Sequence, residues 1–118
     1  MATFKITGFA ESTVRAYFDL FTVDCAEIND EIDAAIDTLV QAYDPKRSVI
    51  TVHEADAADI VAALTALSNG EDEAYERERA KAADRRDPEC MNAARHAARG
   101  LSTLSCNIVK RFGAACYA

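Results

Sequence analysis

The side chains of this sequence that could do chemistry are carboxylates, cysteines and histidines. Asp30, Asp33 and Asp37 recur at intervals of three and four residues. On a helix these aspartates would form a ladder of carboxylates able to face a divalent cation. Calcium sites, however, are built in glycine-containing loops, and these aspartates lie within an uninterrupted helical pattern. We therefore expect no metal site and no cofactor in this chain.

The cysteines and histidines also lack the spacing of a reactive site. The four cysteines include no CxxC pair, which gives a zinc site poor support. Cys90, His96 and Cys106 would lie on different faces of one helix, because six and ten residues separate them. No local motif pairs a nucleophile or an acid with a base, and no glycine-rich loop could hold a phosphate. We expect a protein that is not an enzyme, with reduced and mostly buried cysteines, of which Cys116 is the most exposed.

The acidic residues belong to a segment, 24–43, whose apolar residues recur with the period of an amphipathic helix. Successive side chains of a helix are rotated by about 100°, so the apolar ones fall within an arc of roughly 140°. These apolar residues are Cys25, Ile28, Ile32, Ala35, Ile36, Leu39, Val40 and Tyr43. The opposite arc carries Glu27, Asp30, Glu31, Asp33 and Asp37, and the segment contains no Lys or Arg.

This helix is expected to begin at Asp24 as its N-cap, with Glu27 favoured by the helix dipole. Asp33 and Asp37 would lie beyond the first turn, where the dipole gives little stabilisation. These two aspartates are like charges one turn apart, as are Glu27 and Glu31, and each pair costs roughly a few tenths of a kcal/mol. The fold does not require that cost. The acidic face is therefore either a surface that meets a basic partner or the solvated face of an acidic protein.

Composition limits the possible classes of protein. The 118 residues carry a formal net charge of −7, and 50% of them are hydrophobic. A chain of this size can bury a core without disulfides or metals, so we expect one domain. The negative charge opposes binding to bare nucleic acid or to an anionic membrane. The sequence has no secretory signal and no apolar run long enough to span a bilayer, so we expect a cytoplasmic location.

The first half of the chain predicts a small sheet with one helix. Residues 3–9 alternate apolar and polar side chains, as is typical of a strand. Residues 13–23 fit both a helical and a strand period, and their aromatic and β-branched content favours a strand that forms a hairpin with the first. After the helix at 24–43 and a proline turn at 44–47, residues 48–53 are expected to form a third strand. A right-handed crossover would make this strand parallel to the second.

The second half predicts helices. One begins at Asp56 as its N-cap, has Asp59 in its first turn and stops at the sequence Ser-Asn-Gly of residues 68–70. Residues 71–86 predict a separate, charge-dense helix held by its own ion pairs. Tyr75 is an isolated aromatic residue on that helix and is a candidate for a contact with a partner.

The last helix is predicted to begin at Asp87 as N-cap and to end at Gly113. Gly100 lies in its interior, where glycine costs about 1 kcal/mol relative to alanine, so it marks either a kink or a close approach. The expected fold class is α+β, with a small sheet packed on helices. An acidic ββαβα part over residues 1–70 is followed by two C-terminal helices over 71–118, of which the last is basic.

These patterns favour a non-enzymatic protein–protein interaction module. Its acidic face would dock on a basic surface of a partner, of the type that nucleic-acid-binding complexes present, and inhibit that partner by mimicking a row of phosphates. Small phage-encoded inhibitors of host defence, anti-CRISPR proteins among them, share this size and acidity, which is an analogy with a class and not with a motif. The expected partner-binding residues are Glu27, Asp30, Glu31, Asp33, Asp37, Asp56, Asp59 and Tyr75.

An alternative is a homo-oligomer or adaptor in which the acidic helix pairs with the basic helix, within one chain or between two. Residues 90–118 contain bases and no acid, and Arg95 and Arg99 lie one turn apart. These arginines could face Asp33 and Asp37, although exposed ion pairs are each worth only about 0–1 kcal/mol. A small enzyme whose site assembles only in three dimensions is the remaining alternative.

Overall fold

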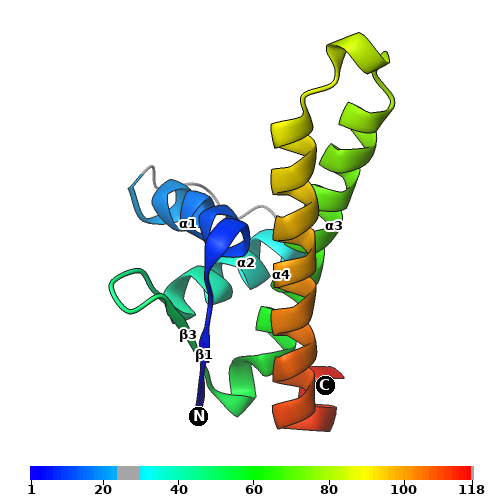
Figure 1. The fold of residues 1–118 in the computed structure, drawn as a ribbon. Coiled ribbons are helices and arrows are strands. Elements are labelled where there is room, and N and C mark those ends of the chain that lie inside the picture. The colour runs from blue at the N-terminus through cyan, green and yellow to red at the C-terminus, as the bar shows by residue number, and fades with distance from the viewer. Residues whose placement is uncertain (24–29, 118) are drawn as a thin grey trace.

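The computed structural model of the chain describes residues 1–23 and 30–117, which form a small sheet packed against helices (Figure 1). In these residues the sheet is antiparallel and has three strands, β1 (Ala2–Lys5), β2 (Tyr43–Asp44) and β3 (Val49–Val52). The α-helices of the same residues are α1 (Gly8–Val23), α2 (Glu31–Ala42), α3 (Ala57–Arg79) and α4 (Pro88–Phe112). Short 3₁₀ segments are η1 (Glu54–Asp56), η2 (Ala83–Arg85) and η3 (Gly113–Tyr117). The α+β class is confirmed, but the order of elements differs from ββαβα.

The predicted strand over 13–23 is wrong, because these residues belong to α1. Ala10 and Val14 are buried, and Tyr17, Phe18 and Phe21 pack partly buried against the same core, which is a helical period. A strand would have turned alternate residues of this segment outward. Burial along a helical stripe therefore outweighs the β propensity of its aromatic residues. The hairpin predicted between the first two segments does not form.

The sheet has the strand order β1–β3–β2, so β3 is central. Phe4 of β1 and Tyr43 of β2 both lie opposite Ile50, and both pairings are antiparallel. The predicted parallel pairing of the strand at 48–53 is therefore wrong, although the strand itself is confirmed at 49–52. In the turn before it, Asp44 Oδ1 accepts hydrogen bonds from the backbone N–H groups of Lys46 at 3.0 Å and Arg47 at 3.4 Å. This tight turn makes β2 and β3 a hairpin.

Helices α3 and α4 form a long antiparallel pair that extends beyond the rest of the molecule (Figure 1). The predicted stop at 68–70 is wrong, because α3 continues through it to Arg79. Ser68 is buried at that point, and its hydroxyl donates a hydrogen bond to the carbonyl of Ala98 at 3.0 Å. The separate helix predicted for 71–86 is accordingly the second half of α3 followed by a connection. We call the outer end of the pair, residues 71–95, the arm.

The ends and the interior of α4 follow the sequence prediction. Asp87 is the N-cap, and its Oδ1 accepts from the backbone N–H groups of Glu89 at 3.0 Å and Cys90 at 3.2 Å. Gly113 ends the helix with a φ of 60°. Gly100 marks a close approach, because a Cβ atom added there would lie 2.8 Å from the Cβ of Ala10. Helix α1 therefore packs directly on α4 at this glycine.

The core lies where the sheet, α1, α2 and the inner half of the α3–α4 pair meet. Its buried side chains contact one another in one cluster. The largest fully buried members are Val14, Leu39, Val40, Ile50, Val52, Ile60, Leu64, Leu101 and Ile108. Within residues 1–23 and 30–117, no helix is both long enough and apolar enough to pass through a membrane.

Candidate functional site

In the structure the acidic residues start at the N-terminus of α2, whereas the prediction placed them further along a longer helix. Asp30 has an extended backbone, with φ −151° and ψ −179°, and its Oδ1 accepts a hydrogen bond from the N–H of Asp33 at 2.8 Å. Asp30 is therefore the N-cap of α2, and a single continuous helix over 24–43 is wrong. The predicted N-cap, Asp24, and the predicted site residue Glu27 lie outside the described residues.

Because α2 begins at this position, its acidic residues cost less electrostatic free energy than the sequence predicts. Glu31 and Asp33 occupy the first turn of α2, where the positive end of the helix dipole stabilises each carboxylate by about 0.3–1 kcal/mol. Asp33 and Asp37, the expected repulsive pair that lies within the described residues, remain one turn apart. Asp37 also accepts a hydrogen bond from Gln41 Nε2 at 2.7 Å. Helix capping thus explains part of the acidic pattern without any partner.

A polar groove of about 440 Å³ continues the acidic surface beyond α2. It lies beside β2, at one edge of the sheet, and Gln41, Asp44 and Asp56 are among its lining residues. Asp56 is the N-cap of α3, but its side chain makes no capping hydrogen bond. The groove therefore brings Asp56 next to the residues of α2. Asp59, the next predicted acid, is exposed one turn further along α3 and does not line the groove.

We call this surface the acidic strip, and it consists of Asp30, Glu31, Asp33, Asp37, Asp44 and Asp56. Asp30 and Glu31 are exposed, and the others are partly exposed. The described lining of the groove contains no Lys or Arg. Asp44 was missed by sequence reasoning, which treated it only as a turn residue. The signal that could have found it is its position directly after the helix that carries the other acids.

A hydrogen-bonded network fixes the end of α2 against α1. The hydroxyl of Tyr43 donates to Glu11 Oε2 at 2.7 Å, and Arg15 Nε donates to the same hydroxyl at 3.3 Å. A terminal guanidinium nitrogen of Arg15 also donates to the carbonyl of Pro45 at 3.2 Å. The hydrogen bond from Tyr43 lowers the pKa of Glu11, while burial and that same bond raise the pKa of Tyr43. Tyr43, buried as expected for the apolar arc, thereby holds the acidic strip in place.

Tyr75 does not join the acidic strip. It lies in the arm, about 27 Å along α3 from Ala57 at a rise of about 1.5 Å per residue. The guanidinium of Arg95 lies over its ring, 5.9 Å from the centroid, which is a cation–π contact between α3 and α4. The ring is therefore used within the chain, as a link between the two helices of the arm. Arg99, the other arginine expected near the acidic helix, lines a cavity beside β1.

The cysteines are arranged differently from the expectation. Cys116 is buried, whereas Cys90 and Cys106 are exposed. Burial raises the pKa of the Cys116 thiol, and a hydrogen bond to Asp87 raises the pKa of Cys90, which disfavours a thiolate at both positions. Within the described parts of the chain, no three His, Cys, Asp or Glu side chains are placed to hold a metal ion.

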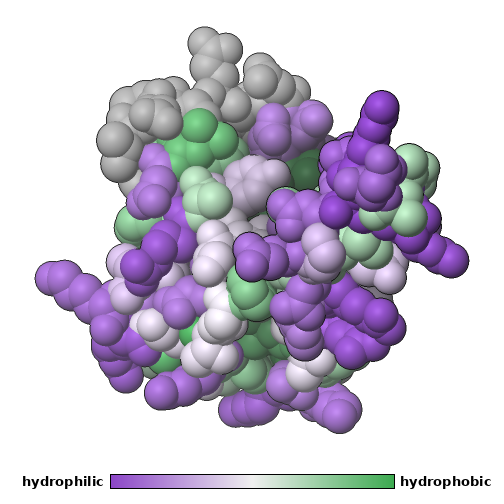
Figure 2. All heavy atoms as spheres, turned by 45° about the horizontal axis from the view of Figure 1, so that its top comes forward, coloured by the Kyte–Doolittle hydropathy of each residue, from purple (hydrophilic) through white to green (hydrophobic). Residues whose placement is uncertain are grey.

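Polar side chains dominate one face of the molecule. Figure 2 shows hydrophilic residues projecting around the face in view, with apolar residues in smaller areas between them. Comparisons of this chain with protein-family models, with curated proteins and with solved structures found no match.

Proposed function

We propose that the protein is a non-enzymatic binding module that docks its acidic strip on a basic surface of a partner protein. The observation that carries the proposal is the groove at one edge of the sheet, which brings carboxylates of β2 and of the start of α3 beside the end of α2. Asp44 and Asp56 come after the helix in the sequence, yet the groove places them beside Gln41, the hydrogen-bond partner of Asp37. This convergence extends the row of charge past the end of the helix.

The strip suits a partner whose own ligand is a row of phosphates. From Asp30 to Gln41 the helix rises about 16 Å, and the groove prolongs the acidic surface from there. Such a surface attracts a basic partner over a Debye length of about 8 Å at physiological salt and speeds association. Occupying a nucleic-acid-binding surface in this way would inhibit it. A cytoplasmic inhibitor of a host defence complex, as some phages encode, is the class that we propose.

The experiment is capture of partner proteins by the tagged chain from a lysate of the host cell in which the inhibitor would act. The test variant carries Asp37→Lys and Asp56→Lys, because neither side chain makes a capping hydrogen bond. A lysine in place of Asp37 would also lie one turn from Asp33 and replace a repulsive pair by an attractive one. The matched control carries Glu73→Lys and Glu76→Lys, two exposed residues of the arm, and has the same net charge. Asp30 is left intact, since its loss would weaken α2.

We expect a basic partner to be retained by the wild type and the control, to be lost with the test variant, and to elute as salt is raised. Retention of the same partner by all three proteins would contradict docking through the acidic strip. Loss from both variants alike would show a dependence on net charge only.

Self-assembly is a second candidate, favoured by the opposite charge of α4. Beyond Glu89 this helix carries Arg95, Arg99, Lys110 and Arg111 and no acid. The acidic strip of one copy could meet these bases on another. Size-exclusion chromatography at low and high salt tests this: a salt-sensitive oligomer supports it, and a monomer in both conditions excludes it.

A further inference from the structure

A second cavity lies at the other edge of the sheet, beside β1. Its volume is about 380 Å³, and it opens between the β1–α1 junction and the middle of α4. Ala10 and Gly100 are both among its lining residues, and the close contact between them joins α1 to α4 at this place. The cavity therefore rests on a rigid helix crossing.

The charged side chains that line this cavity are basic, although the chain as a whole is acidic. It includes Lys5 from β1 and His96 and Arg99 from α4, together with the polar side chains of Thr7, Thr103 and Asn107. No Asp or Glu is found in its described lining, although the chain has 20 acidic residues and only 13 Lys and Arg.

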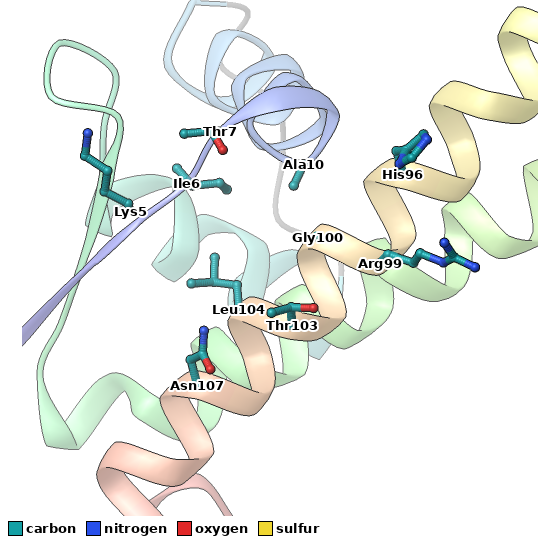
Figure 3. A pocket seen from close by; sticks show the side chains of 10 residues that line it. All are labelled: Lys5, Ile6, Thr7, Ala10, His96, Arg99, Gly100, Thr103, Leu104 and Asn107. Carbon is teal, nitrogen blue, oxygen red and sulfur yellow. The ribbon is translucent and has the colours of Figure 1, made fainter.

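The arrangement of the side chains indicates how an anion would be held. Figure 3 shows Leu104 and Asn107 on the side of α4 that faces β1, Thr103 in front of that helix, and Thr7 across from them. Lys5 and Arg99 start at opposite sides of the opening, and their charged ends extend outward. Both side chains are exposed and have several rotatable bonds, so they can turn inward over an anion placed between the hydroxyl and amide groups.

We propose that this cavity binds a small ligand through a phosphate group. A phosphate accepts hydrogen bonds in several directions, which matches donors that come from two sides, and Arg and Lys are the usual cationic partners of phosphate. The cavity has the size of a small-molecule site. A long polyanion is disfavoured, because the net charge of the chain is −7 and would repel its remaining phosphates. This site is separate from the acidic strip, and its test is independent of the proposed function.

The test is a titration followed by the amide resonances of the protein at constant ionic strength. The probes are inorganic phosphate and glycerol 3-phosphate, with glycerol and chloride as controls. We expect saturable shifts at Thr7, Gly100 and Thr103 with both phosphate-bearing probes and none with glycerol. Tighter binding of glycerol 3-phosphate would assign the site to an organic phosphate, and equal binding would assign it to the free ion.

Variants connect the binding to the cavity. Replacing Lys5 and Arg99 by alanine removes both mobile cations from exposed positions, and we expect the dissociation constant for phosphate to rise about tenfold or more. The matched control, Lys110→Ala with Arg111→Ala, has the same net charge and removes exposed bases from the same helix. Its dissociation constant should change by no more than about twofold.

Three results would overturn the proposal. One is a response that stays linear with phosphate concentration or spreads over the whole surface. Another is equal weakening by the two double variants, with both folded by circular dichroism. The third is tighter binding of a single-stranded oligonucleotide than of either small phosphate, which would indicate a nucleic-acid surface.

Discussion

The two edges of the sheet differ in charge and in how the charged groups are held. On the β2 side, part of the acidic strip is held by short hydrogen bonds, those of Asp30 with the N–H of Asp33 and of Asp37 with Gln41. At the β1 edge, Lys5 and Arg99 extend from the rim of the cavity on long side chains. A fixed array of charge suits a preformed partner surface, whereas mobile cations suit closure around a small ligand. The central strand β3 separates the two.

Substitution of Gly100 should affect the β1 edge most strongly. In Gly100→Val the new Cβ would lie 2.8 Å from the Cβ of Ala10, which is buried and cannot move aside as a flexible side chain would. We expect the free energy of unfolding to fall by about 1–3 kcal/mol. Urea denaturation measures it, and phosphate binding should weaken while partner binding persists in the folded protein. An unchanged stability would mean that α1 and α4 are further apart.

Tyr43→Phe should loosen the β2 edge and change the pH dependence of stability. It removes a hydrogen bond to Glu11 and another from Arg15 and should lower stability at neutral pH by about 1–2 kcal/mol. The pKa of Glu11 is lowered in the folded protein, so its ionised form stabilises the fold above its ordinary value of 4.5. That contribution is lost as the pH falls through the lowered pKa. The raised pKa of Tyr43 gives stability that is full below its ordinary value of 10.0 and is lost as the pH rises through the raised pKa.

The measurement is the unfolding free energy of both proteins across a pH range that spans the ordinary pKa values of 4.5 for Glu11 and 10.0 for Tyr43. The difference between wild type and Tyr43→Phe should be largest near neutral pH and smaller at both ends. A constant difference across this range would show that the network does not depend on ionisation of Glu11 or Tyr43.

Asp30→Ala tests whether a residue of the acidic strip also stabilises the fold. Because Asp30 caps α2, we expect a loss of about 1 kcal/mol in unfolding free energy. Asp30→Asn should retain most of the stability, since asparagine is an equally good N-cap, and yet it removes the charge. If Asp30→Asn lowers partner affinity without lowering stability, the charge of Asp30 serves binding.

Gly70→Ala should change stability least among these substitutions, and it serves as a control for Gly100→Val. Apart from its chain neighbours and the nearby backbone of its own helix, no atom lies within 4 Å of the Cβ that would be added, and the position is inside α3. We expect the melting temperature to rise slightly, from a gain of about 0.5–1 kcal/mol. A loss of stability would indicate that the glycine is needed for the geometry of α3.

Features that depend on neighbouring residues could be predicted from the sequence, whereas features that depend on contacts between distant segments could not. Asp87 with Pro88 defined the start of α4, and Gly113 its end, because capping depends on neighbouring residues alone. The strand predicted for 13–23 failed because the segment fits both periods. Tyr17 and Phe21 pack against the core while Ala16 and Leu20 are exposed, which is the helical pattern. The glycine at 70 suggested a stop, yet packing of Ser68 on Ala98 carries the helix through it.

The two candidate sites differ in the same way. The acids of α2 were visible because they recur within one helix. The cavity beside β1 was not predicted, since Lys5 and Arg99 lie near opposite ends of the sequence and meet only through the crossing of α1 and α4. Gly100 indicated a kink or a close approach in the last helix, but the sequence did not show which segment would approach it.

The arm has a consequence for the dynamics of the molecule. Among residues 71–95, all of which the structure describes, Ala94 alone is buried. In the arm, Arg95 lies over the ring of Tyr75 and Glu78 accepts a hydrogen bond from the N–H of Asp87, and these contacts bury little apolar area. Amide hydrogens of the arm should therefore exchange with solvent through local opening, at lower free energy than those near Leu64 and Leu101. The helix pair would fray from its outer end while both edges of the sheet stay folded.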